Sequence, residues 1–162
     1  METLTAVIMG GGRGSRLDPL TRLRAKLAVP IGGKFRLIDI PISNCLHSAV
    51  RDIFLLTQFN TESLHRHISN TYRFDYFNPG FVRLLAAQQT SENQDWYQGT
   101  ADAVRKNLFF LRNASDYIII LAGDHLYRMD YRKFFDYHLT TNAEISIAAK
   151  PIFEHETKDL DY

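Results

Sequence analysis

The chain has 162 residues, enough for about one domain, and its 45% hydrophobic and 23% charged residues are typical of a globular protein. This composition excludes a disordered chain, a collagen-like repeat and a coiled coil. With 19 Lys and Arg against 18 Asp and Glu, the net charge is only +1, so no nucleic-acid partner is expected. The single cysteine, Cys45, excludes an intrachain disulfide and suits a reducing compartment.

Neither a membrane segment nor an export signal is expected. The longest unbroken apolar run, at 117–122, is far shorter than the ~20 residues of a membrane helix. The N-terminus lacks the basic start and the long apolar stretch of a signal peptide. A cytoplasmic location without a membrane partner is therefore expected.

Apolar runs and helical spacings alternate along the chain. In chain order, the pattern predicts a strand at 4–9, a helix at 38–50, a strand at 53–59, a helix at 61–72, strands at 81–87 and 117–122 on either side of a helix at 102–112, a helix at 131–139 and a strand at 144–149. Thr61 is the expected N-cap of the helix in which Leu64 and Ile68 share one face. Alternating strands and helices indicate the α/β class with a mainly parallel sheet, which binds ligands at the carboxyl ends of its strands.

A glycine-rich loop, 10–14, follows the first predicted strand. Its glycines let the backbone approach a ligand closely, and phosphates bind at this place in α/β sheets. Neither G-x-G-x-x-G nor G-x-x-x-x-G-K-[ST] fits, because Leu17 replaces the last glycine of the first pattern and Phe35 follows Gly33-Lys34 in the second. The alternative interpretation is a glycine-rich turn beside a solvated basic strip.

The residues after this loop are strongly basic. Five cations lie between positions 13 and 26, against the single acid Asp18. They are Arg13, Arg16, Arg22, Arg24 and Lys26. This density favours a triphosphate or pyrophosphate ligand over a single phosphate.

Asp124 stands directly after the predicted strand at 117–122, where Gly123 lets the chain turn. Carboxylate oxygens that face a polyphosphate are ligands that Mg²⁺ prefers. A turn residue or helix cap is the alternative, and the glycine loop at the same expected sheet edge favours the metal site. His65, His67 and His125 lack partners at metal-ligand spacing and are expected to be ordinary surface or core residues.

Several stretches resemble the glucose-1-phosphate adenylyltransferases (ADP-glucose pyrophosphorylases), a branch of the sugar-1-phosphate nucleotidyltransferases. They are GGGRGSRLDPLT (10–21), RAK (24–26) with AVPIGGKFRLIDIPISNC (28–45), LTQFN (56–60), LAAQQT (85–90), WYQGTADAV (96–104) and LAGDHLYRMDY (121–131). The first stretch is shared with the wider superfamily, whereas the second and the last two are specific to this branch. Leu27 stands where the family usually has proline, which leaves φ unrestrained beside Lys26.

The resemblance implies transfer of AMP from ATP to glucose 1-phosphate, giving ADP-glucose and pyrophosphate for glycogen or starch synthesis, with Mg²⁺ and under allosteric control. It also implies a Rossmann-like nucleotidyltransferase domain, with residues 1–162 as its N-terminal, nucleotide-binding portion. The family's C-terminal β-helix domain, second metal-binding aspartate and sugar-phosphate-gripping Glu-Lys pair would lie beyond this chain. The chain alone is therefore expected to be truncated and inactive, and the longer form to be a homo- or heterotetramer.

The resemblance also implies roles for individual residues. Those with catalytic roles would be Arg16, Lys26 and Asp124, the last also binding the metal. Those holding the nucleotide phosphates would be Gly10, Gly11, Gly12, Arg13 and Gly14. The base would meet Gln88 or Gln89 together with Gly99, and Tyr97 would lie near glucose 1-phosphate. Gln58 and Trp96 would couple regulatory and substrate sites.

Two alternatives to this function stay open. One is a pyrophosphorylase for another sugar nucleotide, which would keep the same loop and carboxylate. The other is a non-catalytic, nucleotide-binding regulatory module.

Overall fold

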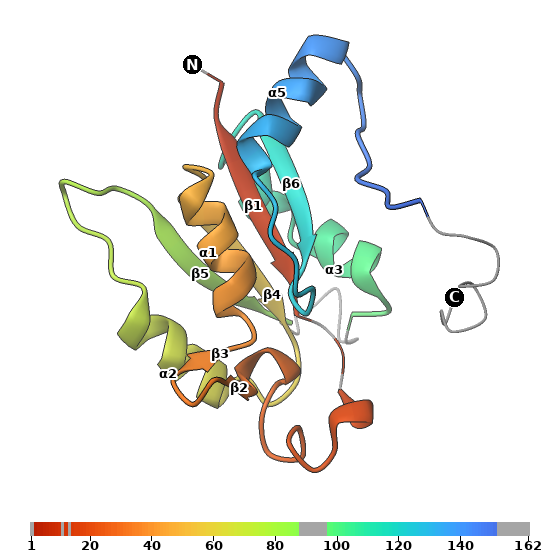
Figure 1. The fold of residues 1–162 in the computed structure, drawn as a ribbon. Helices are drawn as coiled ribbons and strands as arrows, with labels where there is room; N and C mark the ends of the chain where they lie inside the picture. Colours follow the sequence, from red (N-terminus) through yellow and green to blue (C-terminus); the bar gives the residue numbers. More distant parts are fainter. Residues whose placement is uncertain (1, 11, 13, 88–96, 152–162) are drawn as a thin grey trace. The chain divides into compact units, whose positions relative to one another are not determined.

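A computed structural model describes residues 2–10, 12, 14–87 and 97–151, which fall into two compact units divided after Arg132. Within the described part of the first unit, four strands form a parallel sheet in the order β5-β4-β1-β6 (Figure 1). They are β1 (Leu4–Met9), β4 (Asp52–Thr57), β5 (Phe81–Ala86) and β6 (Tyr117–Ala122), and a short antiparallel pair is formed by β2 (Pro30–Ile31) and β3 (Phe35–Arg36). The predicted α/β class with a Rossmann-like parallel sheet is confirmed.

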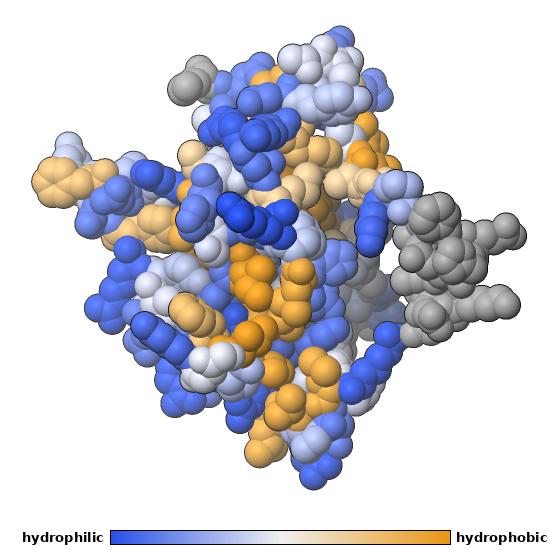
Figure 2. All heavy atoms as spheres, viewed as in Figure 1, coloured by the Kyte–Doolittle hydropathy of each residue, from blue (hydrophilic) through white to orange (hydrophobic). Residues whose placement is uncertain are grey.

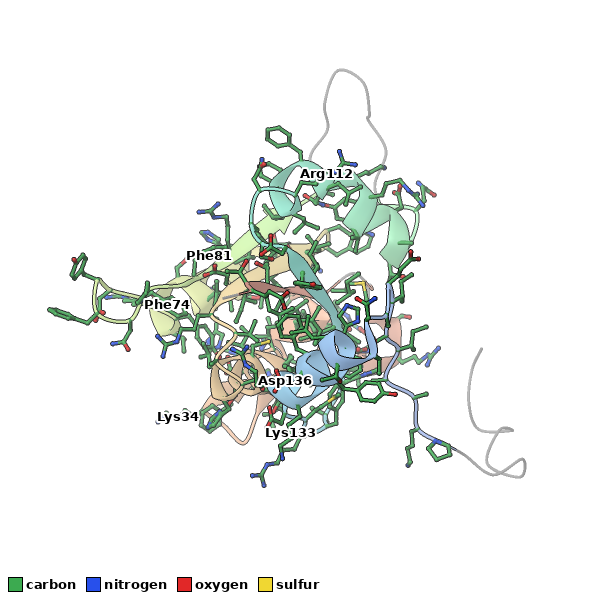
Figure 3. All side chains as sticks on the ribbon, turned by 90° about the horizontal axis from the view of Figure 1, so that it is seen from above. Lys34, Phe74, Phe81, Arg112, Lys133 and Asp136 are labelled. Atoms are coloured by element: carbon green, nitrogen blue, oxygen red, sulfur yellow. The ribbon has the colours of Figure 1, made fainter. Side chains whose placement is uncertain are left out.

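The helices of this unit are α1 (Asp39–His47), α2 (Glu62–Thr71), α3 (Thr100–Lys106) and α4 (Leu108–Leu111), and the short 3₁₀ turns are η1 (Ser15–Leu17) and η2 (Lys26–Ala28). Helix α5 (Tyr131–Thr141) begins at the boundary between the units. Helix α1 lies on one face of the sheet, and α3 and α4 lie on the opposite face (Figures 1 and 3). Both faces of the central strands are therefore covered, which explains their continuous apolar sequences.

The core on the α3–α4 side shows how the strand pattern packs. Val7 of β1 and Phe54 and Leu56 of β4 cluster with Ala103 and Leu111 of the helices, and all are buried. Residues of the opposite parity point to the face that carries α1, because successive strand side chains alternate. Parallel pairing then brings the carboxyl ends of β1, β4 and β6 to one edge of the sheet.

A buried carboxylate joins α1 to α2. Asp39 Oδ1 accepts hydrogen bonds from His67 Nε2 and from the Tyr72 hydroxyl, each at 2.7 Å. Its Oδ2 accepts from the Arg36 backbone N–H, also at 2.7 Å. Burial, followed by the hydrogen bond to Asp39, raises the pKa of Tyr72. His67 is thus a structural residue of this joint, as its contact with Asp39 shows.

The predicted helix at 102–112 is broken. At Asn107 the backbone leaves helical geometry, and the chain continues as α4. The Asn107 side-chain amide donates to the Ala103 carbonyl at 2.8 Å and to the Tyr97 hydroxyl at 2.9 Å. Thr61 lies at the N-cap position of α2 as expected, but its side chain makes no capping hydrogen bond.

The predicted strand at 144–149 is wrong. In the second unit, residues 145–150 belong to no helix or strand, and Ile145 and Ile147 are 79% and 83% exposed. Ser146 Oγ lies 2.9 Å from His138 Nδ1 of α5, so a side-chain hydrogen bond holds this segment. Alternating apolar residues make a strand only when a neighbouring strand satisfies their backbone groups.

The surface on the side of α1 is partly apolar. Figure 2 shows hydrophobic atoms over α1 and over the chain just below it, with hydrophilic atoms around them. Between η1 and η2, Leu20 and Leu23 are 54% and 87% exposed. The basic segment 13–26 is therefore not a purely charged surface.

Candidate functional site

Two adjoining cavities lie at the carboxyl edge of the sheet, in the first unit. The larger has a volume of about 520 Å³ and is lined by Met9, Gly10, Gly12, Gly14, Ser15, Arg16, Leu17, Lys26, Leu27, Thr100, Ala122 and Asp124. The smaller, about 220 Å³, is lined by Met9, Gly10, Gly12, Leu56, Gln58, Tyr97, Gly99, Thr100 and Ala103. Because the two share four lining residues, they form one continuous cleft along the strand ends.

The two ends of the glycine-rich loop need glycine for different reasons. At Gly10 the backbone N–H donates to the Leu56 carbonyl at 2.8 Å, and a Cβ there would lie 3.1 Å from that oxygen. At Gly14, φ is +69°, and a Cβ would lie 2.9 Å from Thr21 Cγ2. The Thr21 hydroxyl donates to the Gly14 carbonyl at 2.7 Å. The loop is therefore held close to its neighbours at both ends.

Lys26 and Asp124 meet across the larger cavity. Lys26 lies on η2, and its Nζ is 2.5 Å from Asp124 Oδ2. Asp124 is the second residue after β6. The intervening Gly123 N–H donates to the Met9 carbonyl at 2.9 Å, which continues the β1–β6 pairing. The glycine loop and Asp124 thus lie at the same sheet edge, as the sequence predicts.

The ion pair keeps Asp124 ionised. Partial burial on its own would raise the pKa of Asp124, but the hydrogen bond and the charge of Lys26 outweigh it, so the pKa lies below the ordinary value. The Lys26 and Asp124 side chains are 32% and 36% exposed, so water still reaches both. The Asp124 carboxylate and the Lys26 side chain are therefore both accessible to a ligand in the cavity.

The cations counted in the sequence do not all reach the cavity. Arg16 and Lys26 line it, whereas Arg22 pairs with Asp18 at 2.9 Å on the surface. Arg24 is not part of the lining. The positive charge that faces the cleft within the described residues is thus lower than the sequence count implies.

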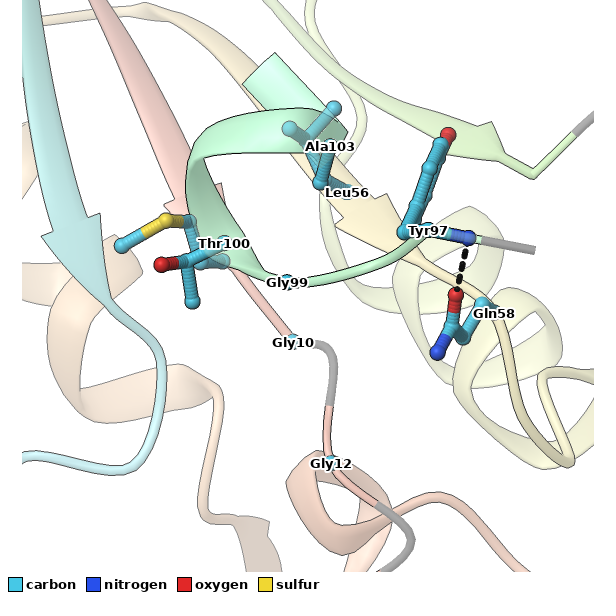
Figure 4. Close-up of a pocket in the computed structure, with 9 residues that line it drawn as sticks. Gly10, Gly12, Leu56, Gln58, Tyr97, Gly99, Thr100 and Ala103 are labelled. Carbon is cyan, nitrogen blue, oxygen red and sulfur yellow. Dashed lines mark hydrogen bonds between the residues drawn. The ribbon is translucent and has the colours of Figure 1, made fainter. Parts of the chain in front are cut away.

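The smaller cavity is mostly apolar, and its wall is fixed by hydrogen bonds. The Tyr97 backbone N–H donates to Gln58 Oε1 at 3.0 Å, and the phenol ring points away from Gly10 and Gly12 (Figure 4). Because the Tyr97 hydroxyl is bonded to Asn107, Tyr97 serves here as a wall of the cavity. Gly99, with φ of +140°, lies at the N-cap position of α3 beside this wall.

A family model for nucleotidyl transferases matches residues 5–158, nearly the whole chain. The chain belongs to the nucleotidyl transferase family. This places it in the nucleotidyltransferase class of enzymes, whose substrates are in general nucleotides and sugar phosphates.

Some expected residues of this nucleotidyl transferase lie outside the described part of the chain. They are Gly11, Arg13, Gln88, Gln89 and Trp96. Of the remaining expected residues, Gly10, Gly12, Gly14, Arg16, Lys26 and Asp124 line the larger cavity, and Gln58, Tyr97 and Gly99 line the smaller one.

Two site residues were missed in the sequence: Thr21, which fixes the loop end at Gly14, and Thr100, which lines both cavities. Leu27 stands out in the sequence only for the absent proline, and its burial beside Lys26, at 2% exposure, is not foreseen there. Thr100 could have been predicted as a site residue, because it directly follows Gly99 at the predicted ligand-binding edge. The contacts of Thr21 and Leu27 depend on tertiary packing, which no local pattern reveals.

The described residues limit the chemistry of this nucleotidyl transferase. Among residues 2–10, 12, 14–87 and 97–151, no three His, Cys, Asp or Glu side chains are grouped to hold a metal ion. Burial raises the pKa of Cys45 to about 12, so this thiol is a poor nucleophile.

No helix in the described ranges has the length and apolar character needed to cross a membrane.

Proposed function

We propose that this nucleotidyl transferase moves AMP from ATP to glucose 1-phosphate and releases pyrophosphate. One observation carries the proposal: the glycine loop, Arg16 and the Lys26–Asp124 pair surround a single cavity at the strand ends. The volume of about 520 Å³ lies within the usual range of small-molecule sites. The branch-specific stretches of the sequence support ATP and glucose 1-phosphate as the substrates.

The cleft suits a nucleoside and its phosphates in separate parts. The smaller cavity, with Leu56 and Ala103 in its wall, would accept the apolar faces of the adenine, and Tyr97, in the same wall, would lie near glucose 1-phosphate. Gly99, and Gln88 or Gln89, would meet the edge of the base. The larger cavity carries Arg16 and Lys26 and would accept the triphosphate. Gly10 and Gly12 line both cavities, at the junction where the α-phosphate would lie.

The chemistry requires charge neutralisation and alignment more than a covalent intermediate. A phosphate oxygen of glucose 1-phosphate attacks the α-phosphorus of ATP in line, and the bond to the bridging oxygen of pyrophosphate breaks. Arg16 would stabilise the charge that develops on the departing pyrophosphate. Lys26 would exchange part of its contact with Asp124 for phosphate oxygens, and loop N–H groups would hold the triphosphate in place.

Mg²⁺ fits this cleft through its ligand chemistry. It is usually held by one or two carboxylates together with substrate phosphates rather than by a dedicated cage of side chains. Among the described residues that line the cavity, Asp124 supplies one carboxylate, and its lowered pKa favours the ionised form that a cation needs. Asp124 would help to hold the ion, which would supply further positive charge at the transferred group.

The test is a substrate panel with the intact protein, at the full length that its gene encodes. Pyrophosphate release is measured for ATP, GTP, UTP, CTP and dTTP, each with glucose 1-phosphate, mannose 1-phosphate and N-acetylglucosamine 1-phosphate. We expect ATP with glucose 1-phosphate to give the highest kcat/KM and to need Mg²⁺. Asp124→Asn is expected to remove most of this activity, whereas Asp116→Asn, which changes a carboxylate at the opposite end of β6, is not.

The panel also separates the alternatives. A preference for another nucleotide or sugar phosphate would assign the protein to a different sugar-nucleotide pyrophosphorylase. Tight ATP binding without pyrophosphate release from any pair would indicate a non-catalytic binding module. Either result would overturn the proposed activity.

A further inference from the structure

Leu27 lies where the two loops of the cleft meet. Its side chain is almost fully buried, with 2% exposure. A Cβ at Gly10 would lie 2.6 Å from Leu27 Cδ1, and a Cβ at Gly123 would lie 2.8 Å from the same atom. One methyl group of Leu27 therefore fills the space that both glycines leave open.

Those two glycines begin the two loops that build the site. Gly10 starts the glycine loop after β1, and its N–H bonds to the Leu56 carbonyl. Gly123 precedes Asp124 after β6, and its N–H bonds to the Met9 carbonyl. The loops differ in sequence position by more than a hundred residues, yet the same leucine side chain packs against both.

The backbone around Leu27 is anchored outside these loops. The Leu27 carbonyl accepts from the Ile38 N–H at 3.1 Å, and the Ala25 N–H donates to the Asn60 carbonyl at 3.0 Å. Because the turn is tied to the start of α1 and to the chain after β4, the Leu27 side chain works as a fixed spacer. It sets how far the glycine loop and Asp124 lie from the turn.

The neighbouring Lys26 completes this arrangement. A Cβ at Gly14 would lie 3.1 Å from Lys26 Cβ, so the stem of the lysine packs against the far end of the glycine loop. Its Nζ reaches Asp124. Consecutive residues of one turn thus contact both ends of the loop, and a shift of Leu27 would also move the Lys26 ammonium.

We infer that Leu27 is a positioning residue, which sets the gap between the glycine loop and Asp124 and so aims the Lys26 ammonium at the phosphates of the bound nucleotide. The effect of Leu27 on the reaction rate rests on the proposed function. The packing of Leu27 against Gly10 and its effect on the position of Lys26 do not depend on that function.

The catalytic arm compares Leu27→Ala with Leu111→Ala in the intact protein. Leu111 is also a fully buried leucine, but it lies on α4 and lines neither cavity. We expect Leu27→Ala to lower kcat by up to about 100-fold, with a smaller change in the KM for ATP, because displacement of a catalytic group by about 1 Å has this effect. Leu27→Met, which restores the volume, should recover most of the rate, and Leu111→Ala should keep kcat while lowering the melting temperature.

A second measurement needs no turnover. The acetylation rate of Lys26 is followed by mass spectrometry, with Lys34 of the same chain as an internal reference. We expect a severalfold faster modification of Lys26 in Leu27→Ala, and no change in Leu111→Ala. Equal Lys26 acetylation in these two variants and the wild type would overturn the inference, as would equal kcat at a temperature where all are folded.

A double-mutant cycle tests the contact itself. Gly10→Ala should lower the melting temperature strongly in the wild type and much less in Leu27→Ala, because the closest clash is with the leucine side chain. Gly123→Ala is the matched control. Its Cβ would also lie 2.8 Å from the Met9 carbonyl oxygen, and Leu27→Ala does not remove that clash. Gly123→Ala should therefore still lower the melting temperature in the Leu27→Ala background. Additive effects at Gly10 would contradict the spacer role.

The outcomes separate the two proposals. Wild-type protein that releases no pyrophosphate from any substrate pair would overturn the proposed function, while the acetylation and the cycle would still decide the role of Leu27. If Leu27→Ala does not fold, Leu27→Val takes its place in every arm, because it also removes Cδ1 while keeping a core side chain.

Discussion

Lys26 keeps the Asp124 carboxyl ionised although burial opposes the charge. In Lys26→Met, the hydrogen bond and the positive charge are lost while the burial remains. We therefore expect the pKa of Asp124 to rise from its depressed value. A ¹³C NMR titration of the aspartate carboxyls, with Asp124→Asn to identify the signal, measures the shift.

The sign of this pKa shift also fixes the pH dependence of stability. Because the folded-state pKa of Asp124 is depressed, the pair stabilises the wild type fully above the ordinary value of 3.8, and this contribution is lost as the pH falls through the folded-state pKa. Both side chains are about one-third exposed, so the effect should not exceed about 1 kcal/mol. Urea unfolding of the wild type and Lys26→Met at pH 7 and pH 3 checks it, and a pKa of Asp124 that is unchanged in Lys26→Met would contradict this account.

Among the structural elements, the glycine loop contains one glycine that stability requires and one that ligand binding requires. Among the described residues, the nearest atom to a Cβ at Gly12 would be the Gly14 backbone nitrogen, at 3.9 Å. At Gly14, by contrast, φ is +69° and a Cβ would lie 2.9 Å from Thr21 Cγ2. Gly14→Ala should therefore lower the free energy of unfolding by about 1–2 kcal/mol or more. Gly12→Ala should leave stability nearly unchanged and weaken ATP binding by about tenfold or more, because the new methyl group lies in the cleft lining.

Urea unfolding and calorimetric titration with ATP measure the two effects on the same protein samples. Each glycine variant serves as the control for the other. Equal losses of stability in both variants, or unchanged ATP affinity in Gly12→Ala, would show that the loop is not held as described.

The joint between α1 and α2 depends on the Asp39 carboxylate. Asp39→Ala leaves the Arg36 N–H, His67 and the Tyr72 hydroxyl without their shared acceptor. We expect a loss of about 3 kcal/mol in the free energy of unfolding, since buried donors to a charged acceptor lose their partner. Asp39→Asn keeps one carbonyl acceptor and should lose less. A loss below about 1 kcal/mol for Asp39→Ala, at the low end of hydrogen-bond contributions, would contradict the burial of this joint.

The sheet and its ligand-binding edge are predictable from the sequence for a physical reason. Strands buried on both faces appear as continuous apolar runs, and the parallel topology of an α/β unit then brings their carboxyl ends together. The positions of Gly10 and Asp124 follow directly from this rule, since each comes just after a strand that pairs with the other.

The other features of the fold and of the site depend on contacts between residues that are distant in sequence, or on which of several nearby residues a side chain contacts. The break at Asn107 follows from a hydrogen bond to Tyr97, and the segment at 144–149 lacks a strand partner within the described residues. Arg22 turns to Asp18 instead of the cleft, which a count of charges cannot show. The packing of Leu27 against Gly10 requires both loops to be in place.

At the scale of the whole molecule, ligand binding should protect one edge of the sheet. In the intact protein, saturating ATP with Mg²⁺ should slow hydrogen exchange of the backbone at 10–17, 26–28 and 122–125, which line the cleft or adjoin its lining residues. The opposite edge, at 50–52 and 114–117, should exchange as before. Mass spectrometry of peptic fragments measures both, and protection centred on the opposite edge would move the binding site away from the strand ends.

The stereochemical course at the α-phosphorus tests most directly how the cleft works. The proposed reaction is one in-line displacement that Arg16, Lys26 and Asp124 assist by charge and alignment, with no protein nucleophile. The intact protein is given glucose 1-phosphate and one diastereomer of ATPαS, and the configuration of the thiophosphoryl product is determined by ³¹P NMR. A single displacement gives inversion at phosphorus, and we expect this result. Retention would reveal a covalent nucleotidyl-enzyme intermediate and contradict the proposed mechanism.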